Sequence, residues 1–276
     1  MPSPSPTQTE KAARFRDLHA GPVPFVIPNP WDGGSARLLA AAGFQALATS
    51  SWAAAASYGR RDGRLLRSEA MAHVRLIVEA TDLPVSGDLE NGFGPSTNDV
   101  TQTLQEAAAA GLVGASIEDA TGDAHSPLYE FEHALDRIRA AVGVVRALPF
   151  PFVLTARAEG LIRGRPDLGE IIRRLQAFEE AGADVLFAPG LKDLASIETV
   201  CRSVSKPVNV MNALPQPFTI DQLAAAGVRR ISLAASLYRK ALTGVQEAAQ
   251  EMKHSGTFSF VPTSLTSAEV NGFLPE

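Results

Sequence analysis

The sequence predicts a (β/α)8 barrel of the TIM type with an appended C-terminal helical segment. Its 276 residues suffice for one large domain, and short β-rich runs alternate with Ala-rich amphipathic stretches about eight times. Charged and hydroxyl-bearing residues also gather where the predicted strands end. A doubly wound open sheet is the alternative, but no Gly-rich dinucleotide fingerprint follows the first predicted strand.

Eight runs with the composition of buried strands define the predicted sheet. They cover residues 25–29, 46–50, 85–90, 115–120, 152–159, 184–190, 207–213 and 229–236. Helical patterns lie between them, at residues 35–43, 68–82, 96–111, 166–183 and 219–228. Several end in Ala-Gly, and glycine accepts the positive φ that often follows a helix.

The predicted domain organisation has three parts. Residues 1–10 are expected to be a flexible tail, residues 11–253 the catalytic barrel, and residues 254–276 a C-terminal extension. The first twenty residues lack the apolar core of a signal peptide.

Composition excludes several classes of function. A net charge of -5 without a basic cluster argues against nucleic-acid binding. No apolar run approaches the roughly 20 residues of a membrane span. Cys201 is the single cysteine, which rules out an internal disulfide and favours a cytoplasmic location.

Acidic residues at the ends of neighbouring strands suggest a metal site. Asp88 and Glu90 end the third predicted strand and Glu118 ends the fourth, where barrels carry their catalytic groups. Hard cations prefer oxygen ligands, so we expect Mg²⁺ on these three carboxylates, with Mn²⁺ as the alternative metal. The absence of a His pair at ligand spacing argues against zinc. Helix capping or pairing with arginines stays open as another role for these acids.

Two further features of the same end have two readings each, and a third predicts a turn. Arg157 could hold a substrate carboxylate or an enolate oxygen, or form an ion pair with a neighbouring glutamate. The turn that contains Ser50 and Ser51 could bind a carboxylate through hydroxyl and N–H groups, or could only accommodate a bulky neighbour. Gly92 and Gly94 predict a turn that needs positive φ after the acidic pair.

Motifs at the strand ends resemble a known superfamily. "GDLENGFG" begins at Gly87, "ASIEDA" at Ala115 and "LTARAEG" at Leu154. With "PFVIPNPWDGGSARLLAAAGF" near the start, they resemble the isocitrate lyase/phosphoenolpyruvate mutase superfamily, most closely its mutase-like branch. The resemblance covers nearly the whole chain.

The resemblance implies a fold and a metal site. It implies a (β/α)8 barrel whose last helix is exchanged between the subunits of a homodimer or homotetramer, which suits the tail after Lys253. Asp88 would be the main Mg²⁺ ligand, with Glu90 and Glu118 as further ligands that often act through water.

The resemblance also implies roles in catalysis and substrate binding. Ser50 and Ser51 would bind the substrate carboxylate. Asp62 would lie near the reacting carbon, or be only a turn residue, and Arg157 would face the 2-oxo or enolate oxygen. Glu118 joins them as a catalytic residue, and we expect Asn212, near the end of the seventh predicted strand, to contact the substrate.

Departures from the family pattern narrow the predicted reaction. The loop "ATGDAHSPLYEFEHA" lacks the cysteine and the basic pair of the gating loop in isocitrate lyases. His125 in this loop could transfer a proton or simply be solvated. Pro189 stands where the mutases have a histidine, and Cys201 is expected to be a buried bystander.

The predicted function is a Mg²⁺-dependent carbon–carbon lyase that acts on a small 2-oxo or 2-hydroxy carboxylate through an enolate. Decarboxylation of oxaloacetate is the least demanding such reaction, because water can supply the proton. A mutase or hydrolase of the P–C bond in a phosphonopyruvate-like substrate is one alternative. A non-catalytic protein that binds 2-oxo acids is the other.

Overall fold

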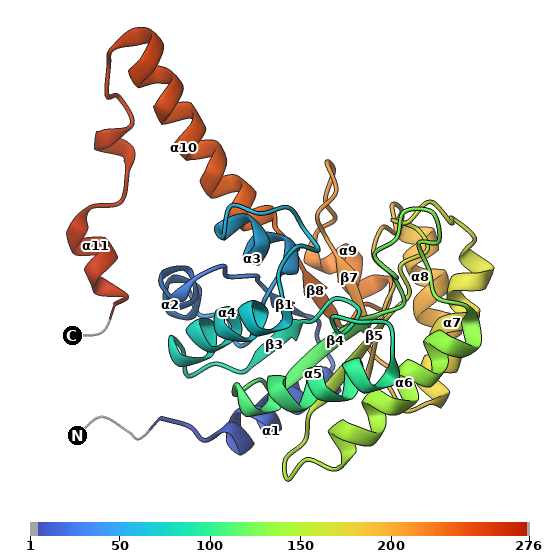
Figure 1. The fold of residues 1–276 in the computed structure, drawn as a ribbon. Helices are drawn as coiled ribbons and strands as arrows, with labels where there is room; N and C mark the ends of the chain where they lie inside the picture. Colours follow the sequence, from blue (N-terminus) through green and yellow to red (C-terminus); the bar gives the residue numbers. More distant parts are fainter. Residues whose placement is uncertain (1–4, 275–276) are drawn as a thin grey trace.

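The protein, seen as a computed structural model that describes residues 5–274, is a nearly closed barrel of eight parallel strands surrounded by helices (Figure 1). The strands are β1 (Phe25–Ile27), β2 (Leu47–Ala48), β3 (Val85–Asp88), β4 (Gly114–Glu118), β5 (Val153–Arg157), β6 (Val185–Phe187), β7 (Val208–Met211) and β8 (Arg230–Ser232). Their order is β1-β8-β7-β6-β5-β4-β3-β2. The TIM-type barrel is confirmed, and each predicted strand overlaps one observed strand.

The helices follow the strands in the expected alternation. They are α1 (Gln8–Ala20), α2 (Gly33–Ala41), α3 (Ser51–Ser57), α4 (Arg67–Glu79), α5 (Thr97–Ala109), α6 (Phe131–Arg146), α7 (Leu168–Glu180), α8 (Leu194–Ser203), α9 (Ile220–Ala225), α10 (Ser236–Ser255) and α11 (Ser267–Gly272), with a 3₁₀ turn η1 (Val261–Thr263). Side-chain caps begin many of them; Asp193, for example, accepts a hydrogen bond from the N–H of Ser196.

Strand side chains alternate between an apolar outer layer and a polar lumen. Ala115, Ile117 and Leu154 point outward into the main apolar core between strands and helices. The residues between them point inward, and the register places Glu118 beside Arg157. All eight strands run the same way, so their carboxyl ends meet at one mouth.

Asn29 joins the two strands at which the hydrogen-bonded ladder is interrupted. The Ala48 N–H donates to the Pro28 carbonyl across this seam at 3.0 Å. The Asn29 amide donates to the carbonyls of Ala48 and Thr49 at 3.1 Å each and accepts from the Leu233 N–H at 3.0 Å. A buried side chain thus ties the ends of β1, β2 and β8 together.

The segment after β2 forms helix α3, whereas the sequence predicts a turn there. Its sequence is rich in alanine, the residue with the highest helix propensity, and Ser50 caps it by accepting from the Ala53 N–H. The helix therefore begins immediately after β2, at the mouth of the barrel.

Helix α1 closes the opposite end of the barrel. Phe15 packs with Phe25, Val153 and Val185 in a separate apolar cluster. Gln8 donates to the carbonyls of Ala108 and Leu112. Because these contacts fix residues 8–10 in a helix, the predicted flexible tail is too long; its residues 1–4 lie outside the described part of the chain.

His19 of α1 lies buried beneath the lumen and gives the fold a pH-dependent stability. Burial, then the charge of Arg230, lowers the pKa of His19 from 6.5 to about 3. The unfolded chain therefore takes up a proton below pH 6.5 that the folded protein refuses until about pH 3, so stability falls as the pH is lowered through this window. Between pH 7.5 and pH 5 the loss should be about 2 kcal/mol.

Urea unfolding at the two pH values measures this effect. The variant His19→Asn, which has no imidazole to titrate, should lose less stability between them than the unmodified protein does. An equal pH slope in both proteins would show that His19 carries no share of the acid sensitivity.

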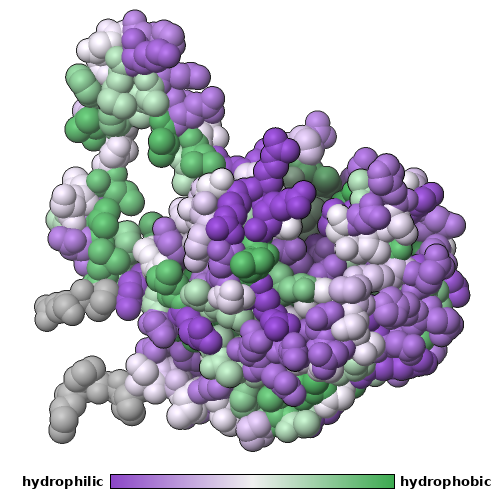
Figure 2. All heavy atoms as spheres, viewed as in Figure 1, coloured by the Kyte–Doolittle hydropathy of each residue, from purple (hydrophilic) through white to green (hydrophobic). Residues whose placement is uncertain are grey.

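Helix α10 leaves the barrel and packs little against the rest of the protein. It projects outward, and the chain then turns back toward α11 (Figure 1). It contains no buried residue, and Leu242, Val245 and Met252 are exposed. Figure 2 shows apolar surface on this arm. In the stretch from residue 5 to residue 274, no helix combines the length and the apolar character that crossing a membrane requires.

Candidate active site

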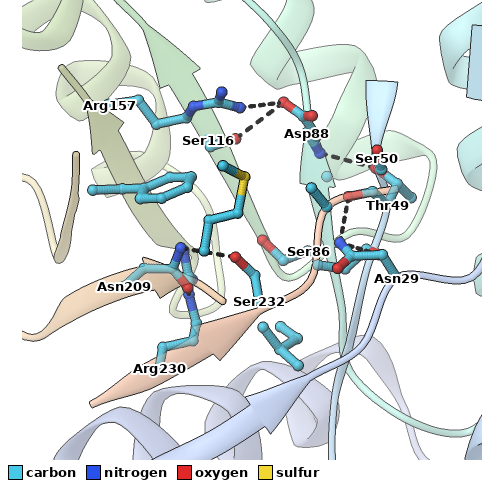
Figure 3. A pocket seen from close by; sticks show the side chains of 16 residues that line it. Asn29, Thr49, Ser50, Ser86, Asp88, Ser116, Arg157, Asn209, Arg230 and Ser232 are labelled. Atoms are coloured by element: carbon cyan, nitrogen blue, oxygen red, sulfur yellow. Dashed lines mark hydrogen bonds and ion pairs between the residues drawn. The ribbon is translucent and has the colours of Figure 1, made fainter. Parts of the chain in front are cut away.

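A pocket opens at the carboxyl ends of the strands, as the sequence predicted (Figure 3). It encloses about 80 Å³. Its lining comes from all eight strands and the segments that follow them: Ile27, Asn29, Ala48, Thr49, Ser50, Ser86, Gly87, Asp88, Ser116, Arg157, Phe187, Asn209, Met211, Arg230, Ser232 and Ala234. Most of the polar members face the lumen from alternate strand positions.

Asp88 is held in one orientation by contacts on three sides. Its Oδ1 accepts from Arg157 Nη1 at 2.8 Å, and its Oδ2 accepts from the Ser51 N–H at 3.0 Å. The Asp88 N–H donates to Thr49 Oγ1 at 2.9 Å, and the Ser116 hydroxyl lies 3.5 Å from Oδ1. The carboxylate is therefore fixed in place at the mouth of the barrel.

Arg157 is the centre of the charged network. Its guanidinium contacts Asp88 at 2.8 Å, Glu118 at 3.2 Å and Glu159 at 2.8 Å. Burial alone would lower the pKa of Arg157, but Glu159, Glu118 and Asp88 hold it well above its usual value. The ion pairs expected as one of two roles are present, and they leave a permanent positive charge beside Asp88.

Two glutamates next to Arg157 are almost fully buried. The Glu159 side chain is 0% exposed and that of Glu118 8%. Arg163, from the loop after β5, reaches both at 3.3 and 3.4 Å. Burial raises the pKa of Glu118 well above its usual value, against the opposing charge of Arg157. Since burial favours the protonated form, this carboxyl is suited to hold a proton.

Glu90 and Asp62 lie nearby and make no ion pair with any residue between 5 and 274. Burial, then the charges of Asp88 and Asp62, raise the pKa of Glu90 to about 7. Loss of solvent and the charge of Asp88 raise the pKa of Asp62 also, while Ser51 and Gly63 oppose the shift. This side of the mouth is short of positive charge.

The three predicted metal ligands do not form a ready-made cluster. Within residues 5–274, no group of three or more His, Cys, Asp and Glu side chains is arranged to hold a metal ion directly, and Arg157 lies between Asp88 and Glu118. The donors are nevertheless all carboxylate oxygens, and Glu90 lacks a cationic partner. They fit a hard divalent cation that Asp88 would bind directly and that Glu90 and Glu118 would contact through water. The metal assignment stays a prediction.

The turn after the acidic pair adopts positive φ at Gly92, as expected, and also at Glu90 and Phe93, but not at Gly94. Glu90 has φ +50°, Gly92 +82° and Phe93 +59°. Gly94 is outside the positive-φ region; a Cβ there would collide with the Asp99 carboxylate. The αL backbone at Glu90 is uncommon for a residue with a side chain.

Ser50 and Ser51 both make hydrogen bonds that stabilise the fold around the mouth of the barrel. Ser50 caps α3 with its hydroxyl, and the Ser51 N–H already donates to Asp88. Ser50 lines the pocket. The role of both residues in binding a substrate carboxylate stays a prediction.

Asn212 does not line the pocket, whereas Asn209 does. The Asn212 amide donates to the Phe218 carbonyl at 2.8 Å and accepts from the Phe218 N–H at 3.0 Å. Both ends of this side chain thus hold the loop after β7. Asn209 lies within β7, and its side-chain amide donates to Ser232 Oγ at 3.0 Å.

Sequence reasoning missed the polar lumen residues. Ser86, Ser116, Asn209, Arg230 and Ser232 all line the pocket. A signal was present, because Ser86 precedes Asp88 by two positions and Ser116 precedes Glu118 by two. This period of two places each pair on the same, inward face.

Of the other predicted site residues, Ser51, Asp62, Glu90 and Glu118 lie near Asp88 or Arg157 but are not in the lining of this pocket, and His125 and Cys201 lie elsewhere. His125 lines a separate cavity of about 380 Å³ beside the loop after β4, together with Arg165 and Arg174. Cys201 lies half-buried in α8, and burial raises the pKa of its thiol to about 11. Such a thiol is a poor nucleophile at neutral pH, which agrees with the bystander role expected for it.

A (β/α)8 barrel with acids and an arginine at its mouth belongs to the class of barrel enzymes with active sites at the strand ends. The family model for phosphoenolpyruvate phosphomutase matches residues 15–253. The chain therefore belongs to this family, within the isocitrate lyase/phosphoenolpyruvate mutase superfamily, and the predicted resemblance is confirmed.

Three similar proteins illustrate the chemistry within the superfamily. A candidate lyase/mutase from Burkholderia cenocepacia has a solved structure that is 49% identical to this chain, with a TM-score of 0.94 over 96% of each chain. The oxaloacetate decarboxylase of Bradyrhizobium diazoefficiens is 30% identical over 78% of this chain and 76% of its own. A phosphonopyruvate hydrolase, solved with oxalate and Mg²⁺, is 26% identical with a TM-score of 0.86 over 95% of this chain and 94% of its own. Such relatives support an enzyme of the lyase type.

Proposed function

We propose that the protein is a Mg²⁺-dependent carbon–carbon lyase that cleaves a small 2-oxo or 2-hydroxy carboxylate. The observation that carries this proposal is the pair of Asp88 and Arg157 at the pocket, 2.8 Å apart and flanked by Glu90 and Glu118. An anionic metal ligand and a fixed cation beside it suit a substrate that carries both a carboxylate and a developing enolate oxygen.

Each residue has a distinct role in this reaction. A divalent ion on Asp88 would act as a Lewis acid toward the 2-oxo group. Arg157 supplies a fixed positive charge for the enolate oxygen that develops when the C3 bond breaks. Asp62, whose pKa is raised by burial and by the charge of Asp88, would exchange a proton with the reacting carbon directly or through a water molecule. Ser50 and Ser51 orient the substrate carboxylate.

The loop after β4 favours decarboxylation over cleavage of a larger tricarboxylate. It has no cysteine to protonate a carbanionic product, and its His125 lines another cavity. Water can protonate the small enolate left by loss of CO₂. The relative that decarboxylates oxaloacetate supports the same choice. Similarity to the phosphonopyruvate hydrolase makes P–C cleavage the second candidate.

A panel of short oxo and hydroxy acids tests the proposal. Oxaloacetate, incubated with the purified protein and Mg²⁺, should yield pyruvate faster than in Mg²⁺ solution alone, and chelation should remove the difference. Phosphate release from phosphonopyruvate would favour the second candidate. Binding of oxo acids without any turnover would show that the protein is a binder and not an enzyme.

We also propose that the protein works in the cytoplasm as a homodimer or homotetramer. The unpacked helix α10, with Val245 65% exposed and Leu242 44% exposed, supports a partner subunit at this arm.

Val245→Glu should shift the mass measured by light scattering toward the monomer, because a buried charge without a partner opposes association. Glu247→Gln, on the same helix, is the control. An unchanged mass for Val245→Glu would contradict this role of α10.

A further inference from the structure

Arg230 is a buried cation at the base of the pocket that the proposed reaction does not use. It is the first residue of β8, is 5% exposed and lines the pocket. Figure 3 shows Arg157, Asp88 and Ser116 along one side of the pocket and Asn209, Arg230 and Ser232 along another. The pocket thus contains two arginines at different levels of the barrel.

The partners of Arg230 are all neutral. Nε donates to Asn209 Oδ1 at 2.9 Å, Nη2 donates to Thr155 Oγ1 at 2.9 Å, and Nη1 lies 3.4 Å from His19 Nε2. No carboxylate in residues 5–274 forms an ion pair with it. Arg157, by contrast, contacts three carboxylates. Among residues 5–274, Arg230 therefore lacks the anionic partner that normally compensates the charge of a buried guanidinium.

His19 does not change this charge balance. Its Nδ1 lies 2.7 Å from the Phe15 carbonyl, which makes Nδ1 the protonated nitrogen and leaves Nε2 as an acceptor for Arg230. Since its pKa is lowered to about 3, the ring is uncharged at neutral pH. Arg230, whose pKa is lowered by burial and by Arg157 to about 9, stays charged there.

The guanidinium still has hydrogen-bonding capacity. Three of its five N–H groups have the acceptors named above, and the remaining two have none among residues 5–274. The pocket that it lines holds about 80 Å³, room for several waters or one small anionic group. The hydroxyl of Ser232 and the amide of Asn209 line the same part of the pocket.

We propose that Arg230, with Asn209 and Ser232, binds the second carboxylate of a dicarboxylic substrate. This inference rests on the proposed function, which places the 2-oxo or 2-hydroxy end at Asp88 and Arg157. Thr155, which Arg230 contacts, lies two residues before Arg157 on β5, about 6.5 Å along the strand. A four-carbon diacid is long enough to reach from one arginine to the other. Arg230 thereby selects diacids over monocarboxylates.

A pair of stable acids isolates this subsite. Malate and 2-hydroxybutyrate have the same number of carbons, and only malate has the distal carboxylate. Calorimetric titration of the full-length protein in Mg²⁺ buffer should show tighter binding of malate. In Arg230→Met, malate affinity should fall roughly tenfold to a hundredfold, while 2-hydroxybutyrate affinity stays within about twofold of the original value. Arg229→Met is the control. It removes a charge from the adjacent, outward position and should change neither the affinity for malate nor the affinity for 2-hydroxybutyrate.

The proposal would be overturned if the unmodified protein bound the two acids with equal affinity. It would also be overturned if Arg230→Met reduced the affinity for malate and for 2-hydroxybutyrate by the same factor. Should Arg230→Met not fold, Arg230→Lys keeps the charge but not the forked donors, and it should retain part of the preference for malate. A crystal soaked in malate gives a direct readout, with the distal carboxylate expected against the guanidinium. If oxaloacetate is not turned over but malate is preferred through Arg230, the lyase reaction fails and the subsite stands.

Discussion

Replacing Arg157 by lysine should reduce kcat for the cleaved 2-oxo acid by roughly a hundredfold or more while the protein still folds. The guanidinium bonds Glu159 through Nε and Nη2 and Asp88 through Nη1 at the same time. An ammonium group keeps the charge but cannot reproduce this planar fork. The cation would therefore no longer be held in place beside the developing oxyanion. Steady-state kinetics at saturating Mg²⁺ measure the effect.

The more drastic Arg157→Met change should primarily affect stability. It leaves Glu118 and the fully buried Glu159 without their main cation, and breaking a buried ion pair costs about 3–5 kcal/mol. Arg173→Lys, on the outer surface of α7, is the matched control and should change neither kinetics nor folding. Full activity in Arg157→Lys would mean that Arg157 is only a structural ion-pair residue.

Asp88→Asn should abolish most Mg²⁺-dependent turnover, with a loss of about a hundredfold or more in kcat. An asparagine oxygen can still accept from the Ser51 N–H, so the turn before α3 should keep its position. The amide has no charge with which to bind the divalent ion or to pair with Arg157. Turnover measured across a range of Mg²⁺ concentrations should show that excess metal does not restore the rate.

Asp136→Asn is the control for this substitution, because Asp136 lies exposed on α6 and pairs only with Arg139. Its kinetics should equal those of the unmodified protein. Retention of full Mg²⁺-dependent activity by Asp88→Asn would show that Asp88 is not the metal ligand.

The barrel could be predicted from sequence because it depends on local, periodic signals. Short strand-like runs alternate along the chain with helical patterns, and the helical patterns often end at Ala-Gly. The same logic located Asp88, Glu118 and Arg157, since a polar residue at the end of an apolar run faces the mouth of a parallel barrel. The structure places Arg157 in contact with both Asp88 and Glu118.

What escaped prediction depends on contacts between distant segments. Arg230 is next to Arg229 in the sequence, and only the barrel register shows that Arg230 points into the lumen. The sequence predicts that Asn212 contacts the substrate, but the pocket is lined by Asn209 and not by Asn212. Helix α1 was missed in part because its first residues look like a polar tail; their helix is stabilised by packing under the barrel.

The central claim, that carboxylates at the mouth share one divalent ion with room for the substrate, is tested most directly by a crystal structure grown with Mg²⁺ and oxalate. We predict density for an octahedral ion bonded to Asp88 and to oxalate, with Glu90 and Glu118 reached through ordered waters and Arg157 turned toward oxalate. An empty mouth, with Arg157 still closed on Asp88 and no ion among the carboxylates, would contradict it.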